Sequence, residues 1–292
     1  MKPTSLIFLA LAAVLLFTGW FTCSIASTMA DAQGVSIYEQ SRNKKGDIVY
    51  VYNLSDQKLS KLSLNFTDID VTIVGSAKSS YVELKNFNAY DYSAKLSGGS
   101  VTVDGTISGI SSFIDMSGGG LRFKGLRYFF ADKPLRGHKR SVTIYLSDAS
   151  SIKTLNLTLR NGNVTLKNIW NETVDYNITV TVGSATFDQV VTTSIINANV
   201  SAGNITASNT KAKTFNAGIV GGNLNVDTTN YAAEFVSYNV KTANSTLTHN
   251  DTPIADGQLK IATPSDIQQC LVKIDATDAT VIIKDNNTEI TE

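Results

Sequence analysis

One short pattern of residues recurs at regular intervals along most of this 292-residue chain. It consists of an apolar residue, two spacers, a small residue that is usually glycine, another spacer, and two apolar residues one position apart. The glycines of the clearest copies are Gly99, Gly119, Gly162, Gly183, Gly203 and Gly222, separated by 20, 43, 21, 20 and 19 residues. Because such a period is typical of solenoid proteins, the sequence predicts an all-β, single-domain β-solenoid of about ten coils of roughly twenty residues.

Apolar and polar residues alternate on both sides of each glycine. Val164 and Leu166 follow Gly162 in this way, and Leu157 and Leu159 precede it. Alternation gives a strand one apolar face and one wet face. We therefore expect each coil to be two strands joined at a structural hinge formed by one of the six glycines. Glycine suits a hinge because it tolerates positive φ and lets the next coil's backbone approach closely.

The period continues through copies that lack a glycine. The step of 43 residues leaves room for one further coil, which we place at residues 140–144, where Arg140 takes the anchor position. Weaker copies follow at Val240–Leu247, Ile254–Ile261 and Ala276–Ile283, so the C-terminal coils are expected to be irregular. The alternative is an antiparallel sandwich, because its hairpin turns also recur and also use glycine and asparagine.

The composition fits an exported β-protein without a strong electrostatic field. Apolar residues make up 42% of the chain, and 25 basic residues balance 25 acidic ones. The balance argues against a nucleic-acid partner, so any partner must be recognised locally. Eleven Asn-x-Ser/Thr triplets occur, which follow from Asn at turns and Thr on outward strand faces, and no glycan is assigned.

The N-terminus carries an uncharged apolar run, Leu6 to Ala26. It is long enough to cross a bilayer as a membrane anchor, whereas Ala30-Asp31-Ala32 offers a cleavage site for a signal peptide. Either alternative exports the body, as a single-pass protein of the cell membrane with an extracellular C-terminal domain or as a secreted protein. We divide the chain into the signal segment 1–32, a linker and entry strand 33–58, the β-solenoid 59–285 and a polar tail 286–292. Cys23 lies in the apolar run and Cys270 is alone, so the mature body cannot close an internal disulfide.

The copies from Ser141 onward resemble a known family. Ser141-Val-Thr-Ile-Tyr-Leu146, a short spacer, Ile152 through Leu166 and the three following glycine-hinged coils are similar to the putative-adhesin domain of unknown function, a family of bacterial envelope β-solenoids. The resemblance covers about residues 60 to 285. It implies a β-solenoid and an envelope location, and it supplies neither an agreed ligand nor catalytic residues.

Few residues offer catalytic or metal-binding chemistry. Asp68 and Asp70 form the only close acidic pair, and strand alternation would turn both carboxylates to one side, as a carbohydrate-active enzyme needs. The two histidines, His138 and His249, stand in polar, turn-like sequence without a nucleophile motif. The segment from Gly221 to Asp227 resembles a calcium-binding repeat but has Leu224 at its third glycine. We therefore predict no catalytic residue, no metal, no cofactor and no enzyme activity.

The segment from Arg122 to Arg140 is locally basic, with seven basic residues and one acidic residue. Near an anionic surface each Lys or Arg contributes about 1 kcal/mol, so this segment is a candidate contact with an anionic envelope polymer or lipid. The residues proposed for that contact are Arg127, Lys133, Arg136, Lys139 and Arg140. The alternative, which we favour, is one more coil with its aromatic side chains in the core and its charges in water.

Three functions are compatible with these features. The first is a non-enzymatic extracytoplasmic module of the cell envelope, binding or structural, that meets an unknown envelope polymer or protein and reaches the membrane through the N-terminal helix. The second is a membrane-linked regulator of envelope stress that acts through a partner. The third, a β-helix carbohydrate-active enzyme, needs a carboxylate cluster that the sequence does not show. Fold alone does not choose among them.

Overall fold

The computed structural model describes residues 14–16, 18–19, 38–42, 48–54, 59–87, 93–97, 100–105, 114–115, 122–123, 139–147, 151–170, 173–255, 257–263 and 269–286. Seventeen strands form one sheet and two short strands form another. The strands are β1 Tyr38–Arg42, β2 Ile48–Asn53, β3 Lys61–Phe66, β4 Asp70–Val74, β5 Tyr81–Lys85, β6 Ser93–Ser97, β7 Ser100–Gly105, β8 Ile114–Asp115, β9 Arg122–Phe123, β10 Ser141–Tyr145, β11 Thr154–Trp170, β12 Asp175–Val191, β13 Ile195–Ser208, β14 Thr214–Asp227, β15 Val236–Ala243, β16 Thr246–His249, β17 Thr252–Pro253, β18 Gln258–Ile261 and β19 Cys270–Lys284. The predicted all-β, solenoid-like architecture is confirmed.

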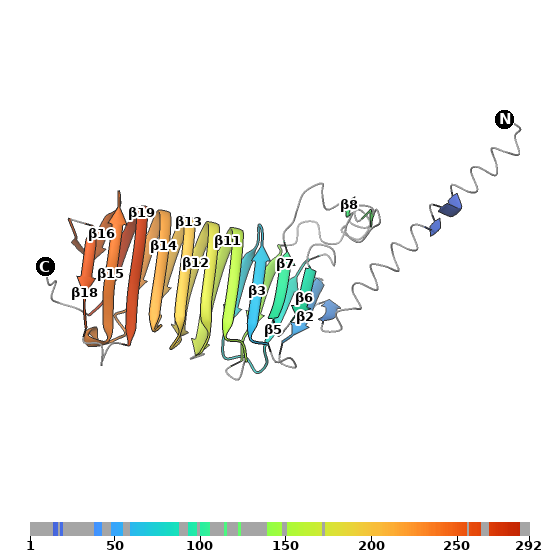
Figure 1. Ribbon diagram of the computed structural model, residues 1–292, viewed down its shortest axis with the longest axis horizontal. Coiled ribbons are helices and arrows are strands. Elements are labelled where there is room, and N and C mark those ends of the chain that lie inside the picture. The colour runs from blue at the N-terminus through green and yellow to red at the C-terminus, as the bar shows by residue number, and fades with distance from the viewer. Residues whose placement is uncertain are drawn as a thin grey trace, which may run out of the picture.

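The body is a stack of parallel layers (Figure 1). In the described part of the chain eight layers follow one another in the order β7 with β10, β3 with β4, β11, β12, β13, β14, β19, and β15 with β16. Neighbouring layers are in register, so that Gly162 pairs with Gly183 and Gly183 with Gly203. Parallel pairing of consecutive coils excludes the antiparallel sandwich for these layers.

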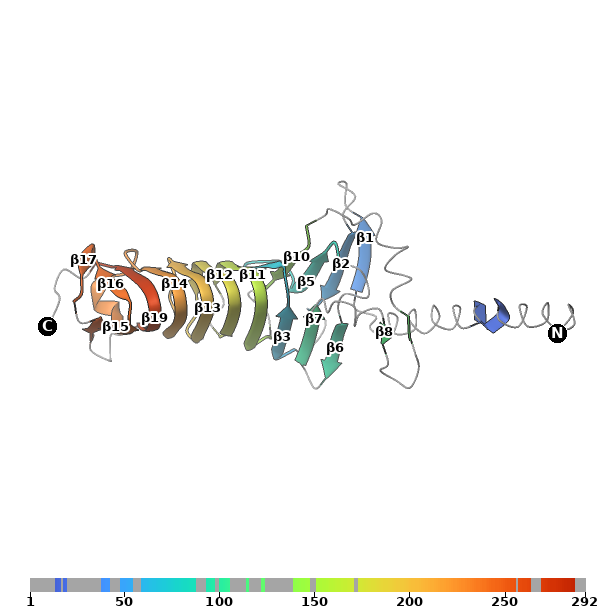
Figure 2. The same cartoon turned by 90° about the horizontal axis from the view of Figure 1, so that it is seen from above.

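Each long strand passes a corner without losing contact with the core. In β11 the side chains of Leu157 and Leu159 are buried before the corner, and those of Val164 and Leu166 after it. Leu159 and Val164 are separated by five positions, an odd number. In a flat strand the side chains of Val164 and Leu166 would therefore point away from the core. The corner therefore resets the alternation, and both arms of the coil contribute to a single apolar core. The succession of the long strands β11 to β14 along the stack is seen from above in Figure 2.

A glycine makes this corner possible in four consecutive layers. Gly162, Gly183, Gly203 and Gly222 have φ between +129° and +142°. A Cβ atom at these positions would lie 1.7 to 1.9 Å from a carbonyl oxygen of the preceding layer. In the layers on either side of these four, β3 with β4 and β19, Ile69 and Ala279 occupy the same place, and the left-handed residue is the preceding aspartate, Asp68 or Asp278. Each long coil is therefore one bent strand, whereas the sequence predicted two strands joined at a glycine hinge.

Several predicted coils are not bent strands like β11 to β14. The residues flanking Gly99 form the antiparallel hairpin of β6 and β7, and β7 also enters the stack by pairing in parallel with β3. Those flanking Gly119 form the separate pair β8 and β9. Gly99 and Gly119 themselves lie outside the described residues. The copy around Gly257 forms β18, which pairs antiparallel with β15. These copies keep the residue pattern because a hairpin strand with one buried face requires the same alternation, and the predicted number of about ten coils is not confirmed.

The layers do not follow the order of the sequence. The sequence predicts that β10 lies between the coils that precede and follow it, but β10 pairs with β4 and β5. The next strand, β11, stacks on β3 and β4, which lie about ninety residues earlier in the sequence. The last strand, β19, lies between β14 and β15 (Figure 1). Any two coils of equal phase can stack, so the repeat alone does not determine which coils are neighbours.

The predicted membrane segment from Leu6 to Ala26 lies for the most part outside the described residues. Among the residues that are described, no helix is both long enough and apolar enough to cross a membrane. The anchor and the cleaved signal peptide both stay predictions, as do the domain boundaries at 32, 58 and 285.

Candidate functional site: a polar face and its pocket

Two rows of polar side chains cross the layers on the outside of the second arm, the part of each coil after the corner. The first row is Asp70, Asn163, Ser184, Asn204 and Asn223, and the second row is Thr143, Thr72, Thr165, Thr186 and Thr206. We call these ten residues the polar face. Each lies beside buried apolar residues of its own strand, so its side chain points away from the core.

Layer stacking sets the geometry of the polar face. Neighbouring layers are about 4.8 Å apart, and residues two positions apart along a strand are roughly 6.6 Å apart. The face is therefore a regular array that runs along the stack, perpendicular to the strands. On β11, β12 and β13 neither row contains a charged side chain.

Hydrogen bonds between layers hold the first row. Asn163 donates two hydrogen bonds to Asp70 Oδ1, one from its backbone N–H and one from its side-chain Nδ2, each at 3.1 Å. Asn223 makes the same pair of bonds to Asn204 Oδ1, at 3.2 and 3.0 Å. The side chains are thus oriented before any ligand arrives.

The hydroxyls of the second row are placed differently. Within the described part of the chain, the Thr165, Thr186 and Thr206 hydroxyls make no hydrogen bond to another residue. On the first arm, by contrast, the amides of Asn177, Asn197 and Asn216 bond to one another in a ladder. The second row therefore keeps a donor and acceptors for a ligand at each layer.

A pocket of about 320 Å³ opens at the end of the first row. Its lining is Asp68, Ile69, Asp70, Lys139, Arg140, Asn161, Gly162 and Asn163. Asp70 forms an ion pair with Lys139, whose side chain is 80% exposed. Asp68 accepts a hydrogen bond from Asn161 Nδ2 at 2.7 Å. The hydrogen bond from Lys139 holds the pKa of Asp70 below its ordinary value, assisted by Asn163 and opposed by partial burial.

The two predicted sites thus meet in one pocket. Asp68 and Asp70 both line it, although they do not share a strand face, because Asp68 is a left-handed corner residue and Asp70 begins β4. Lys139 and Arg140 line it as well, and the Arg140 guanidinium lies 6.0 Å from the centre of the Phe87 ring. Three of the predicted surface contacts, Arg127, Lys133 and Arg136, lie outside the described residues. The coil predicted for the segment from Arg122 to Arg140 lies mostly outside them as well.

The chemistry of the pocket is that of hydrogen bonding and ion pairing. A general acid in glycoside hydrolysis needs a raised pKa, and the pKa of Asp70 is lowered. Among the described residues no group of three or more His, Cys, Asp or Glu side chains could hold a metal ion. The carboxylates, amides and cations that line the pocket can form hydrogen bonds and ion pairs with a polar ligand.

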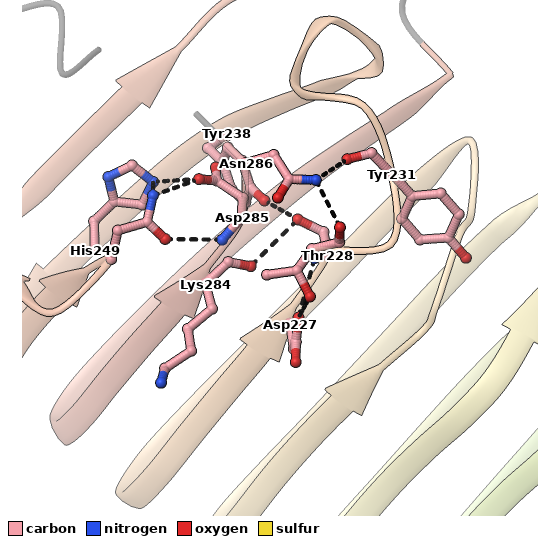
Figure 3. A network of polar contacts seen from close by, with 10 residues as sticks. Asp227, Thr228, Tyr231, Tyr238, His249, Lys284, Asp285 and Asn286 are labelled. Carbon is pink, nitrogen blue, oxygen red and sulfur yellow. Dashed lines mark hydrogen bonds and ion pairs between the residues drawn. The ribbon is translucent and has the colours of Figure 1, made fainter. Parts of the chain in front are cut away.

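A second polar cluster lies at the opposite end of the stack (Figure 3). His249 was expected in a turn, but it ends β16 and its side chain is buried, with Nε2 3.0 Å from Asp285 Oδ1. Asn250 Nδ2 donates to the same oxygen at 2.8 Å. Burial raises the pKa of Tyr238, whose hydroxyl bonds to Thr228. His138 lies outside the described residues.

Sequence reasoning placed Thr on outward strand faces but assigned none of the ten residues of the polar face to a site, and it did not identify this buried cluster. The signal for the face was present in the recurrent Asn-x-Thr triplets at Asn163 and Asn204, which were attributed to turns and outward strand faces. The buried cluster had no such signal, because His249 and Asp285 meet only when β19 enters the stack out of order.

Fold and site together define a solenoid-like, all-β module with a polar surface along its stack. The chain belongs to the Toastrack family, DUF4097, whose family model matches residues 59–291. No curated protein matches the chain at a significant level. This assignment confirms the resemblance of the residues from Ser141 onward to the putative-adhesin domain of unknown function.

Three of the solved structures that are similar to this chain are the following. A putative cell adhesion protein from Clostridium sporogenes aligns with 12% identity and a TM-score of 0.43, covering 85% of this chain and 100% of its own. A putative adhesin from Bacteroides fragilis aligns with 10% identity and a TM-score of 0.36, covering 84% and 99%. A putative lipid binding protein from Parabacteroides distasonis aligns with 11% identity and a TM-score of 0.29, covering 85% and 99%. The family assignment rests on the family model.

Proposed function

We propose that this protein is a non-enzymatic, adhesin-like module outside the cytoplasm that binds a linear polysaccharide of the cell envelope along its polar face. One observation carries the proposal: the polar face continues in register over successive layers without a charged side chain on β11, β12 and β13. A surface of this kind matches a ligand with repeated hydroxyl groups and little charge.

The direction of the face favours a polymer over a small molecule. The hydroxyls of Thr165, Thr186 and Thr206 follow one another at the layer spacing of about 4.8 Å. A chain of sugar units lying along the stack meets the same groups repeatedly, so weak contacts add up along its length. The pocket beside Asp70 and Lys139 supplies a more enclosed contact at one end of the face.

The binding site can be tested with a double variant of the second row. Thr165→Glu with Thr186→Glu places two charges on the polar face without touching the core, and we expect it to abolish retention on purified envelope polysaccharide. The matched control is Thr158→Glu with Thr179→Glu, which places the same charges on exposed first-arm positions of the same two strands. Equal retention of both variants and the unaltered protein would exclude the polar face as the binding site.

The location can be tested separately. We expect the chain to fractionate with the cell envelope and its body to be cleaved by protease added to intact cells. Recovery as a soluble protein that is protected until the cells are lysed contradicts the proposed location.

A further inference from the structure

A small group of exposed apolar residues borders the polar face at the corner of the coils. Val182 on β12 pairs with Ala202 on β13. Gly221 takes the same place on β14, since the residue after it, Gly222, pairs with the residue after Ala202. Val182 and the neighbouring Val220 are 50% and 54% exposed, and Ala202 is exposed as well. We call Val182, Ala202, Val220 and Gly221 the apolar patch.

Each layer presents the apolar patch and the two rows of the polar face in one order. On β12 the patch residue Val182 is followed two positions later by Ser184 of the first row, and Thr186 of the second row comes two positions after that. Residues two positions apart lie within roughly 7 Å of each other along the chain. β13 repeats the order from Ala202 onward. A ligand that covers one layer therefore meets an apolar group, a polar group and a hydroxyl in turn.

Two carboxamides beside the apolar patch each keep one hydrogen-bonding atom for a ligand. Asn204 Oδ1 accepts both bonds from Asn223, at 3.2 Å from the backbone nitrogen and at 3.0 Å from Nδ2. Because a backbone N–H can only donate, the atom that accepts it must be the oxygen of Asn204, which fixes the orientation of that amide. Within the described residues, Asn204 Nδ2 and Asn223 Oδ1 make no hydrogen bond to another residue. One donor and one acceptor thus lie on adjacent layers, next to the apolar patch.

We infer that the polymer bound along the polar face contains N-acetylated amino sugars, whose acetamido groups lie over the apolar patch. The inference rests on the proposed function and names the class of sugar. An acetamido group carries a carbonyl oxygen, an N–H and a methyl group. The carbonyl oxygen accepts from Asn204 Nδ2, the N–H donates to Asn223 Oδ1, and the methyl group packs on the apolar patch. A hydroxyl in the same position leaves the patch in water, and an ammonium offers no acceptor to Asn204.

Three oligosaccharides with one backbone test the inference on the full chain, kept in detergent. They are a cello-oligosaccharide, a chitosan oligomer and a chitin oligomer of equal length, which carry a hydroxyl, an ammonium and an acetamido group at the same carbon. We expect calorimetry to give about ten-fold tighter binding of the chitin oligomer than of the other two, because the methyl contact and the two amide hydrogen bonds form in that complex alone. Equal affinity for all three overturns the inference and leaves the polar face as the binding site.

A double variant tests the apolar patch itself. Val182→Thr with Ala202→Ser makes the patch polar, and we expect the preference for the chitin oligomer to fall to about three-fold, because only the hydrogen bonds remain. The matched control Ile195→Thr makes the same kind of change at a 38% exposed position at the start of β13, and it should keep the full preference.

Two further outcomes contradict the inference. An unchanged preference in the double variant shows that the methyl group does not lie on the patch. If none of the three oligosaccharides binds, the inference fails, while retention on envelope polysaccharide, compared with that of Thr165→Glu with Thr186→Glu, decides the proposed function separately.

Discussion

The corner residue determines whether a coil can join the stack. At Gly203 two constraints act together, since φ is +142° and an added Cβ would lie 1.7 Å from the carbonyl oxygen of Gly183. At Gly221, one position before the corner glycine of the next layer, φ is +74° but the nearest atom to an added Cβ is 4.0 Å away. The two glycines therefore separate the cost of the backbone conformation from the cost of the close approach.

We predict that Gly203→Ala lowers the free energy of unfolding by more than about 3 kcal/mol, because a layer must move away from its neighbour. Gly221→Ala should cost only about 1 kcal/mol, the usual cost of a left-handed alanine. Urea unfolding followed by circular dichroism measures both values. Similar losses in the two variants would show that the close approach contributes nothing.

A second residue-scale prediction concerns Asp70 and pH. Its pKa is lowered in the folded protein, so its carboxylate stabilises the fold above the ordinary aspartate pKa near 3.9, and this contribution is lost as the pH falls through the lowered value. Because Lys139 is exposed, the effect should stay below about 1 kcal/mol. We expect Asp70→Asn to destabilise the protein slightly at pH 7 and by a smaller amount at pH 2. An equal loss at both pH values, measured by urea unfolding, contradicts the role of the charge.

At the scale of elements, the repeat predicts the inside of a coil better than its neighbours. The alternation around Gly162 and Gly183 indicates which residues are buried, since the side chains of a strand point alternately to its two faces. Stacking order is a non-local property, and it is satisfied by any coil of the same phase. For that reason the positions of β10 beside β4 and of β19 beside β14 did not follow from the sequence, and neither did the cluster of His249 and Asp285.

The inserted position of β19 makes the C-terminal layers dependent on it. Val281 is buried in β19 and its neighbour Ile282 points outward. We predict that Val281→Asp removes protection from hydrogen exchange in β15 and β16 while β11, β12 and β13 stay protected, because each layer is stabilised chiefly by its neighbours. Ile282→Asp is the matched control and should change little. Uniform loss of protection in all layers would mean that the stack unfolds as one unit.

At the scale of the whole molecule, the stack turns a residue pattern into a long surface. The polar face exists because in-register layers bring Thr72, Thr165, Thr186 and Thr206 into one line. None of these residues is near another in the sequence. The face and the apolar core are two consequences of the same alternation, one outside the second arm and one inside it.

The central claim is that a polysaccharide lies along this line of layers. The direct measurement is the affinity of the protein for envelope oligosaccharides of increasing length, obtained by calorimetry. Each row of the polar face crosses five layers and spans roughly 20 Å, so we predict that affinity rises with each added sugar until the oligosaccharide reaches that length and then levels off. An affinity that is already maximal for a single sugar, or that never depends on length, contradicts the claim.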